Sequence, residues 1–298
     1  MNHNTTIHKK SYAKINLGLD VTGVRKDGYH LVHMIMQSIS LADEVSITKT
    51  KRKGISLYTN LSYLPTDQRN IAHRAVRILD EDFNFLTCGG VEIHIQKNIP
   101  VAAGLAGGSS NAAAVLLGIN ELFQLGLTTD ELCGYGLRLG ADVPYCILLG
   151  TKLAEGIGEK LSELPCMPEC TILIAKPPSP VSTKKVYEQL DELALDGWDK
   201  LEHPDNQSLI SGLEKQDILL IAESMGNILE KVTVPIHPEI QTIKDLMLKH
   251  GALGAMMSGS GPTVFGIYRD LKLAESAIRE IEEKHLSQQV YVTVPIKG

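Results

Sequence analysis

Apolar and polar residues alternate in several stretches of the chain, and this alternation is the pattern of a β-strand. In residues 11–20, Ala13 and Ile15 fall on one face, and Lys14 and Asn16 fall on the other. We expect the first part of the chain to form an antiparallel sheet. Alternation or a short apolar run predicts further strands at residues 31–39, 45–48, 55–59, 91–95, 171–175, 264–268 and 290–294.

Other stretches carry apolar residues at intervals of three and four, which is the spacing of one face of a helix. Asn70 is a plausible N-cap for the first of these helices, and Thr128 with Glu131 forms a capping box at the start of another. Pro238 and Gly251 mark the start and the stop of a third helix. Helices are predicted at residues 70–83, 109–123, 128–140, 182–193, 217–229, 238–250 and 271–285.

A glycine-rich turn lies between the strand predicted at 91–95 and the helix that follows it. It reads P-V-A-A-G-L-A-G-G-S-S. A strand, a glycine turn and a helix N-terminus in this order form an anion site, because free amides and the positive end of the helix dipole point at one spot. Phosphate is the leading candidate. We call this stretch the glycine loop, and it comprises Pro100, Val101, Ala102, Ala103, Gly104, Leu105, Ala106, Gly107, Gly108, Ser109 and Ser110.

The spelling of the glycine loop separates it from other phosphate and nucleophile motifs. A Walker loop needs a lysine after its last glycine, but Gly108 is followed by two serines. The spacing of the glycines is not G-x-G-x-x-G, and the sequence around Ser110 lacks the last glycine of G-x-S-x-G. The plain alternative is a tight turn whose glycines serve packing alone.

The length of 298 residues suits two domains, and we predict a first domain at residues 1–165 and a second at residues 166–298. The pattern changes after Pro165, and the stiff sequence K-P-P-S-P at residues 176–180 is typical of a linker. Strands and helices alternate in the second part. This alternation favours a small α+β sandwich there.

The composition describes an ordinary globular protein with a net charge of −6 and 43% hydrophobic residues. No basic excess indicates a nucleic-acid partner, and no apolar run is long enough to span a membrane. The five cysteines are odd in number and contain no C-x-x-C pair, which disfavours a disulfide framework and a zinc site. We therefore expect a cytoplasmic protein with reduced thiols.

Two charged residues are candidates for catalytic chemistry. Asp142 lies between a predicted helix end and Pro144, ahead of an apolar run, so we expect it to enter the fold interior. A buried carboxylate needs a partner, and Lys14 is the candidate. The plainer alternatives are a capping aspartate at Asp142 and a solvated outer face at Lys14 and Asn16.

An aromatic pair follows a turn early in the chain. Asp27 and Gly28 give a strong turn signal, and Tyr29 and His30 stand at its exit. Such a pair can stack on a base. Without further support it is more often part of an ordinary surface.

Three separated motifs carry a resemblance to a known superfamily. The glycine loop, the A-K-I-N-L strand at residues 13–17 and the S-G-S-G-P-T turn at residues 258–263 resemble the GHMP kinases, small-molecule kinases that include galactokinase, homoserine kinase and mevalonate kinase. Within this superfamily, A-K-I-N-L-G-L-D, D-G-Y-H and G-A-D-V-P resemble the family of 4-diphosphocytidyl-2-C-methyl-D-erythritol kinases. The resemblance runs from about Ser11 to the C-terminus.

The resemblance implies a phosphoryl transfer from ATP, with Mg²⁺, to the 2-hydroxyl of a cytidylylated methylerythritol in the non-mevalonate route to isoprenoid precursors. Asp142 stands where the family has its catalytic base, and Lys14 stands where it has the partner lysine. The glycine loop matches the ATP-phosphate loop. No residue of the chain is assigned to a metal.

The resemblance also assigns the acceptor site and the fold. Tyr29 and His30 match the cytidine-contacting pair, Asn16 matches an acceptor ligand, and Tyr187 falls where an aromatic residue closes the other face of the base. The implied α+β fold has an N-terminal S5 domain 2-like domain with a left-handed β-α-β crossover, unlike the usual right-handed one, and a C-terminal ferredoxin-like domain. The expected partner is a small molecule with a cytidine diphosphate moiety, and the expected state is a monomer or homodimer.

Two features depart from the family pattern, and two other functions stay open. The polar segment 1–10 precedes the usual start, and G-N-I-L-E at residues 226–230 stands where many members have Asn-Asp-hydrophobic-Glu. The alternatives are a kinase of another small alcohol and a ligand sensor on the same fold that does not turn over. The presence of both Lys14 and Asp142 favours the enzyme, because a sensor does not need that pair. The S-x-x-K sequence at residues 182–185 lacks the companion motifs of a serine hydrolase.

Overall fold

The computed structural model describes residues 5–298, so residues 1–4 of the predicted N-terminal extension lie outside the described residues. The chain forms two compact units. The first contains the chain up to Ala13, Ala42–Val101 and Ala106–Leu148, and the second contains Lys14–Leu41, Ala102–Leu105 and Leu149–Gly298. Both long N-terminal strands and the glycine loop thus contribute to both units. The division near residue 165 stays a prediction.

The sheet of the first unit is built on the second half of a long strand. β2 (His30–Thr50) pairs through residues 44–50 with β4 (Gly90–Gln96) in antiparallel register, and β4 pairs in parallel with β3 (Gly54–Thr59). The expectation of a purely antiparallel sheet is therefore wrong. The break predicted after residue 39 is also wrong, because the polar Asp43 is buried and hydrogen-bonded inside β2.

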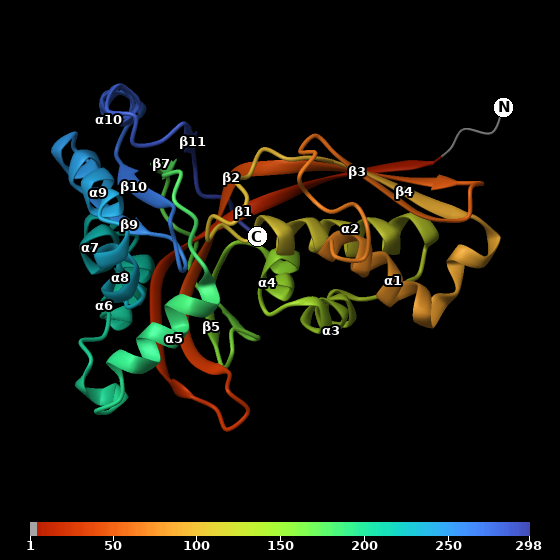
Figure 1. Cartoon of the computed structure of the whole chain (residues 1–298), viewed down its shortest axis with the longest axis horizontal. Coiled ribbons are helices and arrows are strands. Elements are labelled where there is room, and N and C mark those ends of the chain that lie inside the picture. Colours follow the sequence, from red (N-terminus) through yellow and green to blue (C-terminus); the bar gives the residue numbers. More distant parts are fainter. Residues whose placement is uncertain (1–4) are drawn as a thin grey trace. The chain divides into compact units, whose positions relative to one another are not determined.

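Helices of the first unit lie along one face of β3 and β4 (Figure 1). The predicted caps are confirmed, since Asn70 accepts from an amide of the first turn and Thr128 with Glu131 forms a capping box. The second helix begins at Gly107, two residues earlier than predicted. These helices are α1 (Ile71–Phe83), η1 (Phe85–Cys88), α2 (Gly107–Phe123), α3 (Thr129–Leu139) and α4 (Asp142–Leu148).

The second unit contains a four-stranded antiparallel sheet in the order β11-β7-β10-β9, with α9 and α10 on one side (Figure 1). Three of its strands and both helices confirm the sequence pattern, whereas β9 was not predicted. The elements are β7 (Thr171–Lys176), α9 (Glu239–Lys249), β9 (Gly254–Met257), β10 (Val264–Tyr268), α10 (Leu271–Glu283) and β11 (Gln289–Thr293).

The rest of the second unit is built around the other ends of the long strands. β1 (Thr6–Val24) pairs in parallel with β8 (Gly226–Asn227), and residues 34–37 of β2 pair with β5 (Thr151–Glu155). β5 forms a hairpin with β6 (Lys160–Glu163). The accompanying helices are α5 (Thr183–Leu193), η2 (Trp198–Lys200), α6 (Asn206–Lys215), α7 (Ile218–Ser224) and α8 (Glu230–Ile236).

One predicted helix is replaced by three shorter elements. The helix expected at 217–229 ends at Ser224, and β8 and α8 follow it. Asn227 causes the break, because its side chain donates to the carbonyls of Met257 and Gly259 and accepts from the amide of Leu229. A tertiary contact thus overrides the helical spacing. α6, β5, β6 and β8 were not predicted.

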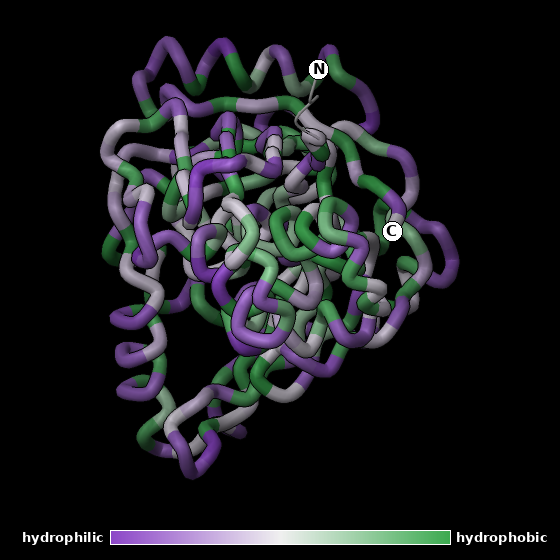
Figure 2. The backbone as a smooth tube through the Cα atoms, turned by 90° about the vertical axis from the view of Figure 1, so that its right-hand side faces the viewer, coloured by the Kyte–Doolittle hydropathy of each residue, from purple (hydrophilic) through white to green (hydrophobic). Residues whose placement is uncertain are grey.

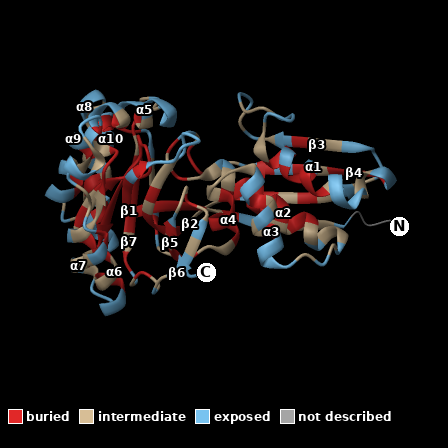
Figure 3. Cartoon of the chain, turned by 90° about the horizontal axis from the view of Figure 1, so that it is seen from below, coloured by how far each residue is buried: buried red, intermediate tan, exposed pale blue. Residues whose placement is uncertain are grey.

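Burial follows the strand and helix patterns in both units. Hydrophobic and hydrophilic segments alternate along the helices in Figure 2, and the middle of β1 and most of β7 are buried in Figure 3. Ile15 and Leu17 of β1 are fully buried, and each such side chain contributes about 1.5–3 kcal/mol. No helix among residues 5–298 is long and apolar enough to cross a bilayer.

His203 ties the segment before α6 to β1 in the second unit. Its Nδ1 lies 2.7 Å from a carboxylate oxygen of Asp20, and its Nε2 lies 2.7 Å from the carbonyl oxygen of Trp198. Both partners accept only, so the ring satisfies both bonds as the imidazolium. The hydrogen bond with Asp20 raises the pKa of His203 above its ordinary value of 6.5.

We expect His203 to make part of the stability pH-dependent. Because its pKa is raised in the folded protein, its contribution to the free energy of unfolding is complete below about pH 6.5 and is lost as the pH rises through the folded-state pKa. Urea unfolding of wild type and His203→Gln at pH 6 and pH 9 measures this. The difference between the two proteins should be larger at pH 6, and an equal difference at both values would contradict the assignment.

Candidate active site

The glycine loop ends at a helix whose first turn has no capping side chain. Ala106 is the N-cap of α2 with φ 55°, and it provides no side-chain hydrogen bond. The amide of Ser110 is the first to bond back, to the carbonyl of Ala106 at 2.9 Å. The amides of residues 107–109 are thus the free donors of the first turn, and with the helix dipole they suit an anion such as phosphate.

Gly104 serves packing rather than ligand approach. A β-carbon at this position would lie 2.1 Å from the carbonyl oxygen of Ser258, and φ is +71°. The hydroxyl of Ser258 donates to the carbonyl of Gly104 at 3.0 Å. The packing alternative is therefore correct for Gly104, and in the second unit this contact brings two of the three resemblance motifs together.

The two glycines at the start of α2 differ in the space around them. A β-carbon at Gly107 would lie 3.0 Å from Ile99 Cγ2 and 3.2 Å from Lys97 Nζ. At Gly108, which is exposed, the nearest atom is Ile71 Cγ2 at 3.7 Å, an ordinary contact distance. Gly108 is therefore the position where the folded chain has room for a methyl group.

A buried carboxylate holds the entrance of the glycine loop, and sequence reasoning missed it. Asp43 Oδ1 accepts from the amides of Asn98 at 2.7 Å and Ile99 at 2.8 Å. Asp43 Oδ2 pairs with the ammonium of Lys97 and accepts from Asn111 Nδ2 at 2.7 Å. Lys97, the basic residue just before the loop, was the available signal in the sequence. Nothing in the sequence linked it to Asp43, more than fifty positions earlier.

The same network continues to the N-terminal strand. Lys97 Nζ also donates to Asn111 Oδ1 at 3.0 Å, and Asn111 Nδ2 donates to Ser11 Oγ at 2.8 Å. Ser11 Oγ donates to Ser110 Oγ at 2.8 Å. Ser110 and Asn111 are thus buried structural residues near the start of α2.

The turn at residues 258–263 is supported from the segment that departs from the family pattern. Besides the bonds of Asn227 to the carbonyls of Met257 and Gly259, Glu230 accepts from the amide of Met257 at 2.7 Å. Lys244 neutralises the other oxygen of Glu230 at 2.7 Å. Residues 226–230 therefore support the turn that packs on Gly104.

Lys14 and Asn16 are buried neighbours in the second unit. Lys14 is 5% exposed, and its Nζ donates to Asn16 Oδ1 at 2.5 Å. The amide of Lys14 donates to the carbonyl of Leu105 in the glycine loop at 3.2 Å. The alternative of a solvated outer face is wrong. A buried ammonium held at a fixed place is available to stabilise negative charge.

Asp142 belongs to the first unit, where it is the first residue of α4 and half-buried. The run after it is buried, as expected, from Val143 to Ile147. Lys14 belongs to the second unit. Their pairing stays a prediction.

His30 and Tyr187, two predicted acceptor residues, contact each other in the second unit. Their ring centroids are 4.5 Å apart at an interplanar angle of 44°, and His30 Nε2 lies 2.8 Å from Asp191 Oδ1. Trp198 is the third ring of this cluster, and its ring centroid lies 6.2 Å from that of His30. To stack a ring between two others, the two outer rings must be about 7 Å apart, which is twice the contact distance of carbon atoms. A base would therefore stack beside this pair unless one ring moves.

Tyr29 is less constrained than its neighbour. It is 59% exposed, and the guanidinium of Arg25 lies 5.9 Å from its ring centroid. The structure thus brings His30 and Tyr187 together but leaves Tyr29 at the tip of the turn. Asp191 and Trp198 are additions that sequence reasoning missed, because both come from a helical region far along the chain.

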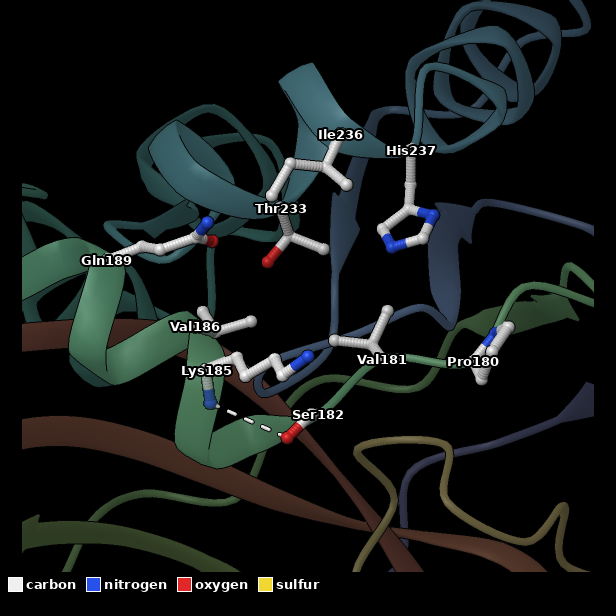
Figure 4. A pocket seen from close by; sticks show the side chains of 9 residues that line it. All are labelled: Pro180, Val181, Ser182, Lys185, Val186, Gln189, Thr233, Ile236 and His237. Carbon is white, nitrogen blue, oxygen red and sulfur yellow. Dashed lines mark hydrogen bonds between the residues drawn. The ribbon is translucent and has the colours of Figure 1, made fainter.

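A pocket of about 530 Å³ lies between α5 and α8 in the second unit. Lys185, Thr233 and His237 point into it (Figure 4). Its lining contains none of the predicted site residues. Among residues 5–298, no group of three or more His, Cys, Asp or Glu side chains is placed to hold a metal. The lining residues are Pro180, Val181, Ser182, Lys185, Val186, Gln189, Thr233, Ile236 and His237.

Comparison with protein families gives two matches along the chain. The model described as GHMP kinases N terminal domain matches residues 70–150, and the model described as GHMP kinases C terminal matches residues 209–288. The first match contains the glycine loop and Asp142. The second contains the turn at 258–263.

Relatives of similar length match over nearly the whole chain. A 4-diphosphocytidyl-2-C-methyl-D-erythritol kinase of Lachnospira eligens is 48% identical over 97% of this chain and 98% of its own. One of Clostridioides difficile is 50% identical over 96% and 94%. A crystal structure of a 4-(cytidine 5'-diphospho)-2C-methyl-D-erythritol kinase aligns with a TM-score of 0.80 at 29% identity, over 98% of this chain and all of the other.

The contrast between Gly108 and Gly104 predicts opposite outcomes for the same substitution. We expect Gly108→Ala to fold normally, with the free energy of unfolding unchanged or raised by up to about 1 kcal/mol, and to bind ATP at least ten-fold more weakly, because the methyl group covers the free amides. Gly104→Ala should be destabilised by about 2 kcal/mol or more, because of its positive φ and the contact with Ser258. Urea unfolding and calorimetric titration with ATP measure both. Wild-type ATP affinity in Gly108→Ala would reduce this glycine to a packing residue.

Proposed function

Because this chain belongs to the family of 4-diphosphocytidyl-2-C-methyl-D-erythritol kinases within the GHMP kinases, we propose that it transfers a phosphoryl group from ATP to the 2-hydroxyl of 4-diphosphocytidyl-2-C-methyl-D-erythritol. The observation that carries the proposal is identity near 50% over almost the full length of the chain and its relatives. The reaction belongs to the non-mevalonate route to isoprenoid precursors.

The experiment that tests the proposal is ATP consumption by the purified chain with a panel of acceptors. The panel contains the cytidylylated methylerythritol, homoserine, mevalonate and galactose. We expect turnover with the first alone. Turnover with another alcohol would assign a different GHMP-type kinase, and ATP binding without turnover on any acceptor would indicate a sensor.

The nucleotide side of the proposal uses the start of α2. The amides of residues 107–109 bind phosphate oxygens, and the open space at Gly108 lets the phosphate approach the backbone. The buried ion pair of Lys97 and Asp43 lies beside Gly107 and holds the segment that leads into the glycine loop. Mg²⁺ bound to ATP would neutralise phosphate charge in this reaction; the residues described assign it no protein ligand.

The chemical step uses Asp142 and Lys14. The acceptor oxygen forms a bond to the terminal phosphorus while the bond to ADP breaks, and Asp142 accepts the hydroxyl proton. Lys14, oriented by Asn16, stabilises the charge on the oxygen. A tertiary hydroxyl is a poor nucleophile at neutral pH, so a base and a nearby cation suit this acceptor. The motif positions of both residues support their roles.

The acceptor side uses the aromatic cluster of the second unit. His30, fixed by Asp191, and Tyr187 offer ring faces and edges to cytosine, and Tyr29 adds an exposed ring next to His30 in sequence. Asn16 is the proposed polar ligand of the methylerythritol portion. Its bond to Lys14 would couple acceptor position to the cation.

The same proposal includes a cytoplasmic location, which the thiol chemistry supports. No disulfide joins the five cysteines, all of which lie within residues 5–298, and burial raises the pKa of Cys170 to about 12, so that thiol is unreactive. Whether the chain is a monomer or a homodimer stays a prediction. Sedimentation of the purified protein measures it.

We expect Asp142→Asn and Lys14→Met each to lower kcat by about a hundredfold or more, the scale of a general acid-base group, with both ligands still bound. The double variant should lose much less than the product of the two losses, because the two residues act as one unit.

Two variants serve as matched controls. Asp130→Asn removes an exposed carboxylate from the first turn of α3, and Lys152→Met removes a buried ammonium paired with Glu163. Steady-state kinetics should give wild-type kcat for the first and, if it folds, for the second. Near-normal kcat in Asp142→Asn would remove the base from the mechanism.

We expect His30→Ala and Tyr187→Ala to weaken acceptor binding while ATP binding is kept. A stacked base contributes about 1–3 kcal/mol, so the acceptor KM should rise roughly five-fold to a hundredfold. Tyr58→Ala is the control, because Tyr58 also pairs with a histidine, His94 at 4.8 Å, but in the first unit. An unaltered acceptor KM in both test variants would refute the cytidine assignment.

A further inference from the structure

Asp43 is a fully buried carboxylate whose two oxygens are bound by different parts of the first unit. Oδ1 accepts the two successive amides of Asn98 and Ile99, which lead directly into Pro100 of the glycine loop. Oδ2 takes the ammonium of Lys97 and the side-chain amide of Asn111, which lies in the first turns of α2. One side chain is therefore bonded to the segment before the loop and to the helix after it.

Only a side chain with two acceptor oxygens and no donor can make these four hydrogen bonds. All four groups that face it donate a hydrogen, and two of them are backbone amides that cannot turn away. An anion with two acceptor oxygens satisfies them all. The bond from Asn98 Nδ2 to the carbonyl of Ala42 at 2.9 Å adds a second tie between the same two segments.

The result of this arrangement is a fixed position for the Lys97 ammonium, paired with Asp43, beside the start of α2. Lys97 Nζ, held by Asp43 and by Asn111 Oδ1, lies 3.2 Å from where a β-carbon of Gly107 would be. The start of α2, whose amides would face a phosphate, is thus held in place by side chains that are already bonded in the free protein. Misplacement of such groups by about 1 Å can cost a hundredfold in rate.

We propose that Asp43 is a positioning residue for the nucleotide site: it joins the entrance of the glycine loop to the start of α2 and fixes the position of Lys97 beside Gly107. It does not touch the ligand. The proposal rests on the proposed function only in taking ATP as the anion. Its effect belongs to the nucleotide and not to the acceptor.

The test variant is Asp43→Asn, which keeps the shape but replaces one acceptor by a donor. The new amide group would face the donors of Lys97 and Asn111, so one side of the junction must open. We expect ATP and ADP to bind at least ten-fold more weakly by calorimetry, with acceptor affinity within two-fold of wild type. Hydrogen exchange should speed up at Asn98, at Ile99 and at Ser110, the first bonded amide of α2, and not in β7.

The matched control is Asp20→Asn, because Asp20 is also a buried carboxylate with a cationic partner, His203, but lies in the second unit. It should lose stability without losing ATP affinity. ATP affinity within two-fold of wild type in folded Asp43→Asn would overturn the proposal, as would an equal loss for both substrates. Failure of wild type to bind ATP would refute the proposed function instead, while the exchange pattern still reports the junction.

A second variant decides the matter if Asp43→Asn does not fold. Asn111→Ser removes the bond from α2 to Asp43 Oδ2, together with those of Asn111 with Lys97 and Ser11, and leaves the bonds of Asn98 and Ile99 to Asp43. We expect a three-fold or greater loss of ATP affinity with acceptor affinity unchanged. Wild-type ATP affinity in this variant would mean that the carboxylate serves folding alone, and the proposal would be wrong.

Discussion

A buried negative charge organises the first unit. Asp43 lies inside a long strand at full burial, where an unpaired carboxylate would cost several kcal/mol. It is tolerated because an ammonium, two backbone amides and a side-chain amide surround it. These partners come from residues 97–99, between β4 and the glycine loop, and from α2. The burial of one carboxylate of β2 thereby joins that strand to both segments.

The second unit uses a different constraint, which is close backbone contact. Gly104 lies so near the carbonyl of Ser258 that no side chain fits there. The turn that carries Ser258 is in turn bonded by Asn227 and Glu230. Residues 226–230 thus hold this turn in place in the second unit.

The three glycines of the loop differ in their surroundings. Packing and a positive φ require glycine at Gly104, and Ile99 and Lys97 lie close to Gly107. Of the three, only Gly108 has room for a β-carbon in the folded chain, with Ile71 Cγ2 at an ordinary contact distance. The kinase proposal therefore depends on this last position and on the free amides of the first turn of α2, whereas the other two glycines shape the loop that presents them.

The sequence by itself determined the features that depend on local pattern and motif. Alternation and helical spacing predicted most strands and helices, the caps at Asn70 and Thr128 are confirmed, and the motifs led to the family. Tertiary structure decided what depends on distant partners. It made β2 continuous through Asp43, broke a predicted helix at Asn227, buried Lys14 beside Asn16, and placed His30 on Tyr187 and Asp191. A pattern read along the chain contains no term for a hydrogen bond to a residue a hundred positions away, and such bonds decide where a polar residue can be buried.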